Sequence, residues 1–290
     1  MSGSDGVVWR IGKRSVRAAA GSVTGDRYDR NYDVLHLDPD RPLAIVADGM
    51  GAGEGSAAAG RIAVDTFARE CGGPSPSALR AAVAQVHSAV RRKARTLHDL
   101  TGCTLTALIG VPPDGPGRSA ALDGSRASGR GPVPPADVRA DPPAPEPAEV
   151  PADLPESEPA VRIVQLGDSR AYRLRGGLLE LLTVDHTIAW LGLIHGWYAA
   201  TDPRAHADGY RLTRYAGHPD EPPPDVLDVP LHPGDRLLLC TDGVSGQLDY
   251  ESLTGLLAAG SPTAAVNALL EATLSAGGQD NATAIVLTVT

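Results

Sequence analysis

The sequence is organised around the stretch Leu43-Ala-Ile-Val-Ala-Asp48-Gly49-Met50-Gly51. An apolar run ends abruptly in an aspartate, and a glycine-rich turn follows it. Short apolar runs bounded by glycine are typical of buried β-strands. Such a strand would carry the carboxylate of Asp48 to a rigid sheet edge, where Gly49 would let the main chain approach whatever that carboxylate binds.

The same arrangement occurs twice more along the chain. Leu237-Leu-Leu-Cys-Thr-Asp242 is a second apolar run that ends in an aspartate, whereas Asp280 precedes the apolar run 284–289. A single aspartate after a strand is a common turn residue. Three aspartates at strand ends, with almost no other polar residue inside the strands, predict a cluster of carboxylates.

Composition limits the classes of protein to consider. The chain has 290 residues, of which 42% are hydrophobic, so it is long enough to form a sizeable core. The net charge of −9 argues against a general nucleic-acid binder. No apolar run approaches the ~18 residues of a membrane span, and the N-terminus lacks a signal-peptide core, which predicts a cytoplasmic protein. The three cysteines, Cys71, Cys103 and Cys240, have no neighbours at metal-ligand spacing, and we expect them to be reduced.

Residues 112–160 differ in character from the rest of the chain. They contain 13 of the 25 prolines, with nine acidic and four basic side chains and almost no large apolar ones. Such a segment cannot bury enough surface to offset the entropy of ordering it, so we predict that it is disordered. Strand-like runs at 104–109 and 161–166 flank it directly. We therefore expect a long Pro/Ala-rich loop that interrupts a single domain, 1–290, rather than a linker between two domains.

Strands and helices are grouped rather than alternating. Strands are expected at 14–22, 34–37, 43–47, 100–110, 161–166, 170–174, 178–182, 236–240 and 284–289, and helices at 53–70, 77–100, 188–198, 250–258 and 262–276. In the second helix, Leu79, Val83, Val86 and Val90 recur at three- and four-residue spacing, which indicates one buried face. Meandering strands and paired helices predict the α+β class, with largely antiparallel sheets covered by helix pairs.

A carboxylate cluster without compensating lysines requires a cation, because like charges at one sheet edge repel one another. Oxygen ligands and a main-chain carbonyl beside glycine suit Mg²⁺ or Mn²⁺. Zinc is the rival ion, but its structural sites use cysteine and histidine, and no suitable histidine pair is present. Two ions bridged by a carboxylate can activate a water and hold a phosphoryl group.

Six motifs in order resemble those of the metal-dependent (PPM, or 2C-type) serine/threonine protein phosphatases, in their bacterial form. They begin at Asp48 (Asp-Gly-Met-Gly), Gly167 (Gly-Asp-Ser-Arg-Ala-Tyr), Leu181 (Leu-Leu-Thr-Val-Asp-His-Thr), Leu212 (Leu-Thr-Arg-Tyr-Ala-Gly), Cys240 (Cys-Thr-Asp-Gly) and Gly277 (Gly-Gly-Gln-Asp-Asn). The resemblance spans roughly residue 21 to the C-terminus, apart from 112–160. It implies an α-β-β-α sandwich of two antiparallel sheets flanked by helix pairs.

The resemblance also implies roles for individual residues. Asp48 would bridge two Mn²⁺ or Mg²⁺ ions, with the carbonyl of Gly49 on one of them and Asp242 and Asp280 on the other. Asp168 would hold a third, weaker ion shared with Asp242, although an aspartate at this point can equally cap a hairpin. A metal-bridging hydroxide would attack phosphoserine or phosphothreonine directly. The catalytic set would then be Asp33, Asp48 and Asp242, with Asp33 ordering water and 188–216 forming a flap beside the site.

The sequence departs from the family pattern near Asp33. Tyr32 replaces an acidic or amide residue, and Tyr28 stands where many members have a phosphate-binding arginine. Arg27 and Arg30, on either side of Tyr28, are the candidates for that role. Met50 is ordinary for bacterial members, and it leaves protonation of the leaving group to water.

The function predicted from these motifs is a phosphoprotein phosphatase that takes part in signalling. Its expected partners are phosphorylated proteins made by a serine/threonine kinase; nucleic acid and membrane are not expected, and the chain is expected to be a monomer. Two alternatives stay open: a pseudophosphatase that binds phosphoproteins or a regulatory partner without turnover, and a phosphatase for a small phosphorylated metabolite. The glycine-rich turn after Asp48 does not fit a dinucleotide loop, because no strand follows its helix at the required spacing.

Overall fold

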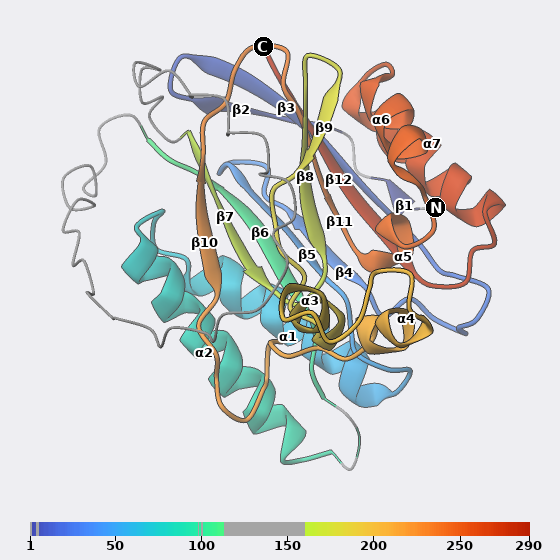
Figure 1. The fold of residues 1–290 in the computed structure, drawn as a ribbon. Coiled ribbons are helices and arrows are strands. Elements are labelled where there is room, and N and C mark those ends of the chain that lie inside the picture. Colours follow the sequence, from blue (N-terminus) through green and yellow to red (C-terminus); the bar gives the residue numbers. More distant parts are fainter. Residues whose placement is uncertain (1, 4–5, 98, 100, 113–159) are drawn as a thin grey trace, which may run out of the picture.

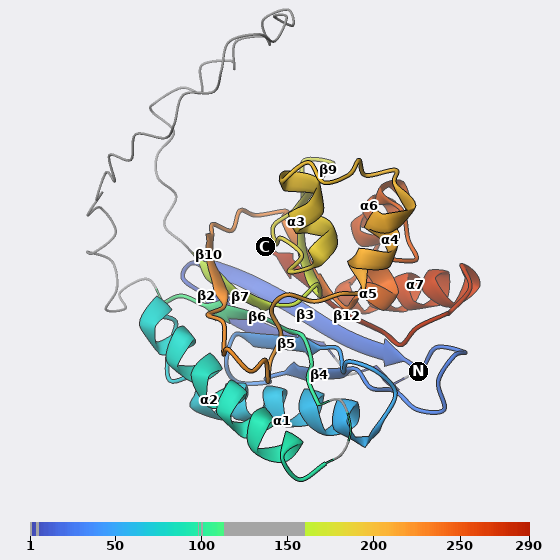
Figure 2. The same cartoon turned by 60° about the horizontal axis from the view of Figure 1, so that its bottom comes forward.

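The structure is a computed structural model that describes residues 2–3, 6–97, 99, 101–112 and 160–290. Two antiparallel β-sheets pack face to face, and helices cover the outer face of each (Figures 1 and 2). The predicted α+β class and α-β-β-α layering are therefore confirmed. Among the described helices, none has both the length and the apolar composition needed to cross a bilayer.

Each sheet contains strands from distant parts of the chain. The larger sheet has seven strands in the order β1-β3-β12-β11-β8-β9, with β2 paired to β3; the smaller has five, in the order β10-β7-β6-β5-β4. The strands of the larger sheet are β1 (Ser2–Gly3), β2 (Val7–Ile11), β3 (Arg14–Val23), β8 (Arg170–Arg175), β9 (Leu178–Leu181), β11 (Arg236–Cys240) and β12 (Ala282–Val289). Those of the smaller are β4 (Val34–Leu37), β5 (Leu43–Ala47), β6 (Leu105–Gly110), β7 (Val161–Leu166) and β10 (Asp225–Val229).

Side chains of the central strands are buried on both faces. In β11, Leu237 and Leu239 enter the core between the sheets, whereas Leu238 and Cys240 pack beneath the helices. Successive side chains of a strand point to opposite faces, so an unbroken apolar run is what a strand covered on both sides requires. This explains why the strands before Asp48 and Asp242 contain so few polar residues.

Two pairs of helices form the outer layers. The helices α1 (Glu54–Glu70) and α2 (Pro76–Ala94) cover the smaller sheet, and α6 (Tyr250–Ala258) and α7 (Pro262–Ser275) cover the larger. The predicted stripe of α2, from Leu79 to Val90, is buried against the smaller sheet. Three shorter helices, α3 (Ile188–Ile194), α4 (Pro203–Gly209) and α5 (Asp242–Ser245), complete the fold.

Some predicted boundaries were wrong. The second helix ends at Ala94 rather than at residue 100, and the strand expected from residue 100 begins at Leu105. Between them, Cys103 forms isolated β-bridges with Gly49 and with Ala216. These partners, distant in sequence, keep the segment around Cys103 out of both the helix and the strand. The sequence pattern did not predict β1, β2, β10, α4 or α5.

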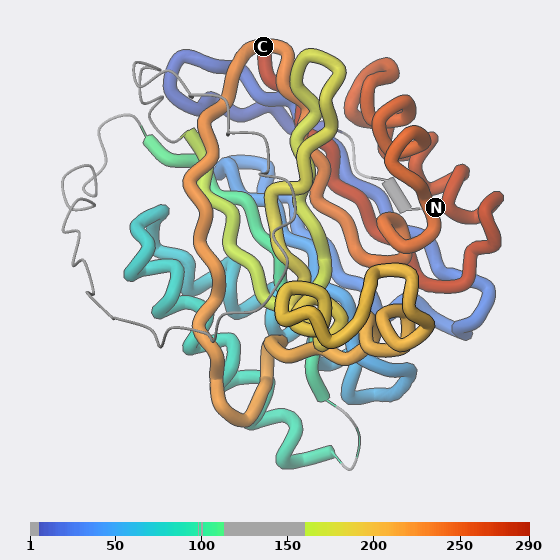
Figure 3. Tube along the Cα trace, viewed as in Figure 1, coloured from blue at the N-terminus to red at the C-terminus, as the bar shows by residue number. Residues whose placement is uncertain are grey.

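The two strands that flank the long insertion are neighbours. The strand β6 pairs with β7, with Gly110 opposite Val161, and the N–H of Val111 donates to the carbonyl of Ala160. Figure 3 shows the two tubes side by side. The predicted disorder of 112–160 falls on residues 113–159, which lie outside the described residues, and the single-domain assignment stays a prediction.

Candidate metal centre

Five predicted site aspartates lie at the same end of the sandwich. Asp33 precedes β4, Asp48 follows β5, Asp168 lies between β7 and β8, Asp242 opens α5 after β11, and Asp280 precedes β12. The strands therefore bring together carboxylates that are up to about 250 residues apart in sequence. Both sheets contribute, so the cluster depends on how the sheets pack.

A cleft of about 240 Å³ opens at this end. Its lining contains every predicted metal ligand, and also Arg27. The predicted residues Asp33 and Arg30 do not line it. The lining residues are Arg27, Tyr28, Asp48, Gly49, Met50, Gly51, Thr104, Asp168, Tyr210, Leu212, Asp242, Asp280 and Asn281.

Asp33 lies behind the cleft in a network of hydroxyl groups. Its Oδ2 accepts hydrogen bonds from the hydroxyls of Thr241 (2.8 Å) and Thr283 (2.7 Å), while its Oδ1 is buried with no partner among the described residues. The hydroxyl of Thr241 also accepts the N–H of Thr283. This network ties β4, β11 and β12 together directly beneath Asp242.

A second hydroxyl network positions the end of β5. The N–H of Asp48 donates to the Thr104 hydroxyl (2.9 Å), and the N–H of Thr104 donates to the Asp48 carbonyl (2.9 Å). The Thr104 hydroxyl also hydrogen-bonds the hydroxyl of Ser169 at 2.7 Å. Because Ser169 follows Asp168, these contacts connect the backbones that carry two of the predicted ligands.

At two positions the backbone lies so close to another segment that only glycine fits. A Cβ atom at Gly243 would lie 1.9 Å from the carbonyl oxygen of Asn281, and one at Gly49 would lie 2.7 Å from that of Ser56. Real Cβ atoms do not come this close to backbone oxygens, so no side chain fits at either position. The Asp-Gly pairs in the sequence therefore mark places where a ligand-bearing turn packs against another segment.

The carboxylates raise one another's pKa values. Burial, and then the charge of Asp242, raise the pKa of Asp48 well above its usual range. Burial raises the pKa of Asp33 to about 7 despite the hydroxyls that stabilise its charged form, and burial with the charge of Asp242 raises that of Asp168 to about 8. The pKa of Asp280 is raised by burial and again by Asp242. A group of carboxylates in this state favours a bound cation.

The donor set fits a hard divalent cation. All candidate ligands are oxygens, and Asp242 Oδ1 is buried without a hydrogen-bond partner among the described residues. In the described part of the chain, no three Asp, Glu, His or Cys side chains are placed to hold one ion by themselves. A site for Mg²⁺ or Mn²⁺ does not need three, because main-chain carbonyls such as that of Gly49 and water complete the shell.

Known proteins of similar sequence and fold are bacterial phosphatases. The serine/threonine protein phosphatase PstP of Mycobacterium tuberculosis is 32% identical over 128 residues, which is 44% of this chain and 24% of PstP. The protein phosphatase PhpP of Streptococcus pneumoniae is 32% identical over 119 residues, 41% of this chain and 48% of PhpP. The chain thus spans less than two thirds of the length of these relatives, and no family model matches it.

The similarity of fold extends over almost the whole chain. The PPM Ser-Thr phosphatase MsPP of Mycobacterium smegmatis, solved with cacodylate, superimposes with a TM-score of 0.70 at 27% identity, over 93% of this chain and 97% of MsPP. The M. tuberculosis PstP/Ppp structure gives 0.71 at 26% identity, over 94% and 98%. The chain therefore has the fold of these serine/threonine phosphatases. The family resemblance that the motifs indicated is confirmed.

Seven residues of this cleft were not among the predicted site residues: Tyr28, Met50, Gly51, Thr104, Tyr210, Leu212 and Asn281. Thr104, Tyr210 and Leu212 line it, yet they come from a strand start and from the segment after α4. Leu212 opens one of the quoted motifs, so that motif was the available signal. Tyr210 and Thr104 had no signal, because hydroxyl residues are common in turns and strands.

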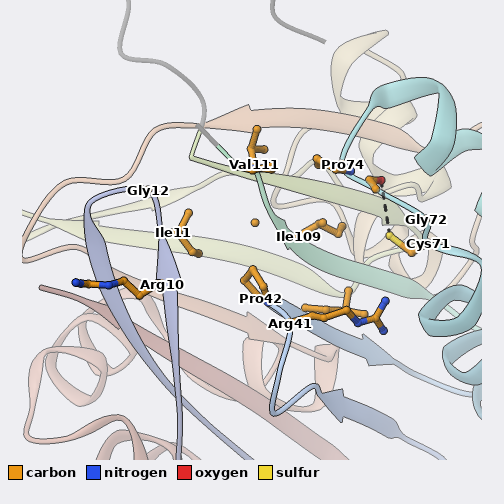
Figure 4. Close-up of a pocket in the computed structure, with 14 residues that line it drawn as sticks. Arg10, Ile11, Gly12, Arg41, Pro42, Cys71, Gly72, Pro74, Ile109 and Val111 are labelled. Atoms are coloured by element: carbon orange, nitrogen blue, oxygen red, sulfur yellow. Dashed lines mark hydrogen bonds between the residues drawn. The ribbon is translucent and has the colours of Figure 1, made fainter. Parts of the chain in front are cut away.

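A larger cavity lies away from the candidate metal site. It measures about 400 Å³ and lies at the other end of β5, lined by Arg10, Pro42, Cys71, Ile109 and neighbouring residues (Figure 4). Among the residues that the structure describes, no carboxylate lines it. Its one cysteine is 3.9 Å from the carbonyl of Gly73, and burial raises the pKa of that thiol. The cavity therefore lacks the groups that the proposed chemistry needs.

Proposed function

We propose that the chain is a metal-dependent phosphoprotein phosphatase that hydrolyses phosphoserine and phosphothreonine. The observation that supports this most strongly is the single cleft that brings together Asp48, Gly49, Asp168, Asp242 and Asp280. The relatives are named as serine/threonine phosphatases, and a PstP catalytic domain has been solved with two manganese ions. That structure has a TM-score of 0.69 at 26% identity, over 95% of this chain and 98% of its own.

In this proposal the cleft holds two Mn²⁺ or Mg²⁺ ions. Asp48, the main-chain carbonyl of Gly49, Asp242 and Asp280 would hold these two ions. Asp168, together with Asp242, would hold a third, weaker ion. When bound, the ions supply an activated water and neutralise the oxygens of the phosphate.

The chain's own residues bind and orient the substrate. Arg27 is exposed at the cleft, where its guanidinium positions the phosphate. The Oδ1 atom of Asp33, which has no partner among the described residues, orders a water behind the ligands. Substrates are phosphorylated proteins, products of a serine/threonine kinase; the cytoplasmic location and monomeric state stay predictions.

The first test is hydrolysis of a phosphothreonine peptide with Mn²⁺, with Mg²⁺ and with chelator. We expect phosphate release that depends on the metal and that falls by at least about 100-fold in Asp242→Asn, because a ligand carboxylate is lost. Isothermal titration of Mn²⁺ should show weaker binding by the variant. No release with either ion, from protein with a cooperative melting transition, would favour a pseudophosphatase instead.

A further inference from the structure

A groove of about 850 Å³ lies beside the cleft, between the α3–α4 segment and the end of the larger sheet. We call it the flap groove; Leu181, Val184, Trp190 and Leu193 are its larger apolar side chains. Figures 1 and 2 place α3 and α4 near α5, at the end of the sandwich that carries the aspartates. The groove and the cleft share Asp168, Tyr210 and Asp242, so they are continuous.

The sizes of the two spaces indicate different occupants. The cleft, at about 240 Å³, is smaller than the ~300–1,000 Å³ of sites that enclose a whole small ligand. It suits the phosphorylated end of a substrate. The flap groove is within that range and opens directly from the cleft, so it suits the part of the substrate that continues beyond the phosphate.

Three large apolar side chains in the groove are exposed to solvent. Leu181 is 48% exposed, and Val184 and Trp190 are each 40% exposed. Clustered apolar side chains on a concave surface mark a binding site, because each exposes surface that association would bury. The groove therefore favours an apolar occupant.

The charges of the groove walls are already neutralised. Asp185 accepts two hydrogen bonds from Arg170, at 2.9 and 2.6 Å, and Asp202 accepts two from Arg204, at 3.1 and 2.8 Å. Away from the metal-site aspartates, these two carboxylates are the acidic side chains of the lining, and both are paired. Apart from Asp168 and Asp242, where the groove joins the cleft, the described lining therefore has no unpaired carboxylate that would favour a basic residue in the occupant.

The groove wall is held in shape before any ligand binds. The Thr187 hydroxyl accepts the N–H of Trp190 at 3.1 Å and caps α3. The Tyr198 hydroxyl lies 3.3 Å from the carbonyl of Ile188 and 3.1 Å from a carboxylate oxygen of Asp208, which connects α3 to α4. A preformed wall reduces the entropy lost on binding.

We propose that the flap groove binds the polypeptide that flanks the phosphorylated residue, and that it selects substrates with an apolar side chain beside the phosphosite. The proposal rests on the proposed function. It names the substrate class as phosphoprotein rather than small phosphorylated metabolite, because a polypeptide continues far enough beyond its phosphate to fill the groove. The apolar side chain packs against Trp190, Leu181 and Val184.

The test compares phosphothreonine peptides that are identical except for one flanking position, which carries leucine or serine and is moved in turn along the peptide. We expect the best leucine peptide to have a kcat/KM about tenfold above its serine counterpart, as loss of one buried apolar side chain typically produces. Trp190→Ala, and separately Leu181→Ser, should abolish the preference. Trp197→Ala is the matched control, because Trp197 is exposed on the same segment but does not line the groove.

Two further measurements separate this proposal from the proposed function. Hydrolysis of p-nitrophenyl phosphate, which has no peptide, should be unchanged in Trp197→Ala and should fall less than peptide hydrolysis does in Trp190→Ala and Leu181→Ser. Its complete absence in the wild type would count against the phosphatase activity alone. Binding of labelled peptides that carry a non-hydrolysable phosphonate, followed by fluorescence anisotropy, tests the groove without turnover. Equal affinity for leucine and serine peptides at every position, or equal losses on peptide and p-nitrophenyl phosphate in Trp190→Ala, would overturn the proposal.

Discussion

Arg27 and Arg30 are close in sequence but differ in their relation to the cleft. Arg27 lines it, with its guanidinium 5.6 Å from the centre of the Tyr28 ring, whereas Arg30 is exposed elsewhere. Arg27 forms no ion pair with any residue that the structure describes. Burial raises the pKa of Asp280, and the positive charge of Arg27 opposes that rise. Its guanidinium is therefore available for an anion.

Replacing Arg27 by glutamine should weaken phosphate binding. A charge-assisted hydrogen bond contributes ~1.5–3 kcal/mol, so we expect Arg27→Gln to raise the KM for p-nitrophenyl phosphate by about tenfold or more. The matched variant Arg30→Gln should leave KM unchanged. Steady-state kinetics at saturating Mn²⁺ measures both, and an effect confined to Arg30→Gln would reverse the assignment.

Tyr32 has a structural contact at the point where the sequence departs from the family motif. Its hydroxyl donates to the carbonyl of Ala52 at 2.6 Å, and its ring meets that of Tyr28 edge-on, with the centroids 5.6 Å apart. Ala52 belongs to the glycine-rich turn after Asp48. The tyrosine that replaces the usual family residue therefore stabilises the turn that carries Gly49. The candidate metal-binding aspartates are all present.

At the scale of elements, α5 packs against the start of β12 without room for a side chain. A Cβ atom added to Gly243, in α5, would lie 1.9 Å from the carbonyl oxygen of Asn281. This close approach places Asp242, at the start of α5, beside Asp280, just before β12. The helix is only four residues long, so packing, rather than helix propensity, determines where it lies.

Alanine at Gly243 should therefore destabilise the protein and its metal site together. A Cβ atom 1.9 Å from a carbonyl oxygen forces α5 and β12 apart, so we expect a loss of ~2 kcal/mol or more and weaker Mn²⁺ binding. Gly255→Ala is the control: Gly255 is exposed in α6 with nothing within 4 Å of the added Cβ. That change should stabilise the protein by ~0.5–1 kcal/mol in urea unfolding. A neutral Gly243→Ala would contradict the packing argument.

The hairpin formed by β6 and β7 should tolerate loss of the insertion. Because Val111 and Ala160 are already hydrogen-bonded, replacing 113–159 by a short Gly/Asn-containing turn keeps the register of both strands. A shorter connection also lowers the entropy of closing the loop. We expect an equal or higher melting temperature and unchanged Mn²⁺ binding by titration calorimetry. Loss of the cooperative transition would show that the insertion is part of the folded unit.

For the molecule as a whole, the candidate metal centre brings together carboxylates from two sheets that repel one another. The pKa values of Asp33 and Asp168, about 7 and about 8, exceed the ordinary value of 3.8. Between about pH 4 and pH 8 the folded metal-free chain therefore binds more protons at these groups than the unfolded chain does. Its stability should fall as the pH rises through this range, since the carboxylates lose protons while they remain buried.

The metal-free protein should melt at a lower temperature at pH 8 than at pH 6. Saturating Mn²⁺ should raise the melting temperature more at pH 8, because the ions bind deprotonated carboxylates. Differential scanning calorimetry with chelator and with Mn²⁺ measures both effects. Asp33→Asn should flatten the metal-free dependence, whereas Asp65→Asn, exposed on α1, should not. Equal melting temperatures at the two pH values without metal would contradict this account.

The sequence by itself determined the layers and the positions of most of the candidate metal ligands at sheet edges. Strands buried on both faces require unbroken apolar runs, and a polar residue that ends such a run must lie at a sheet edge, as Asp48 and Asp242 do. The stripe of α2 likewise follows from helical periodicity alone. These features depend on residues that are neighbours in the chain, so a local pattern predicts them.

The tertiary structure alone decided which residues meet. Asp33 reaches Thr241 and Thr283 across separations of 208 and 250 residues, and Gly49 reaches Ala216 only through Cys103. The position of Arg27, rather than Arg30, in the lining of the cleft and the opening of the flap groove into the cleft have the same origin. Each depends on the packing of distant segments, for which no local pattern of side chains exists.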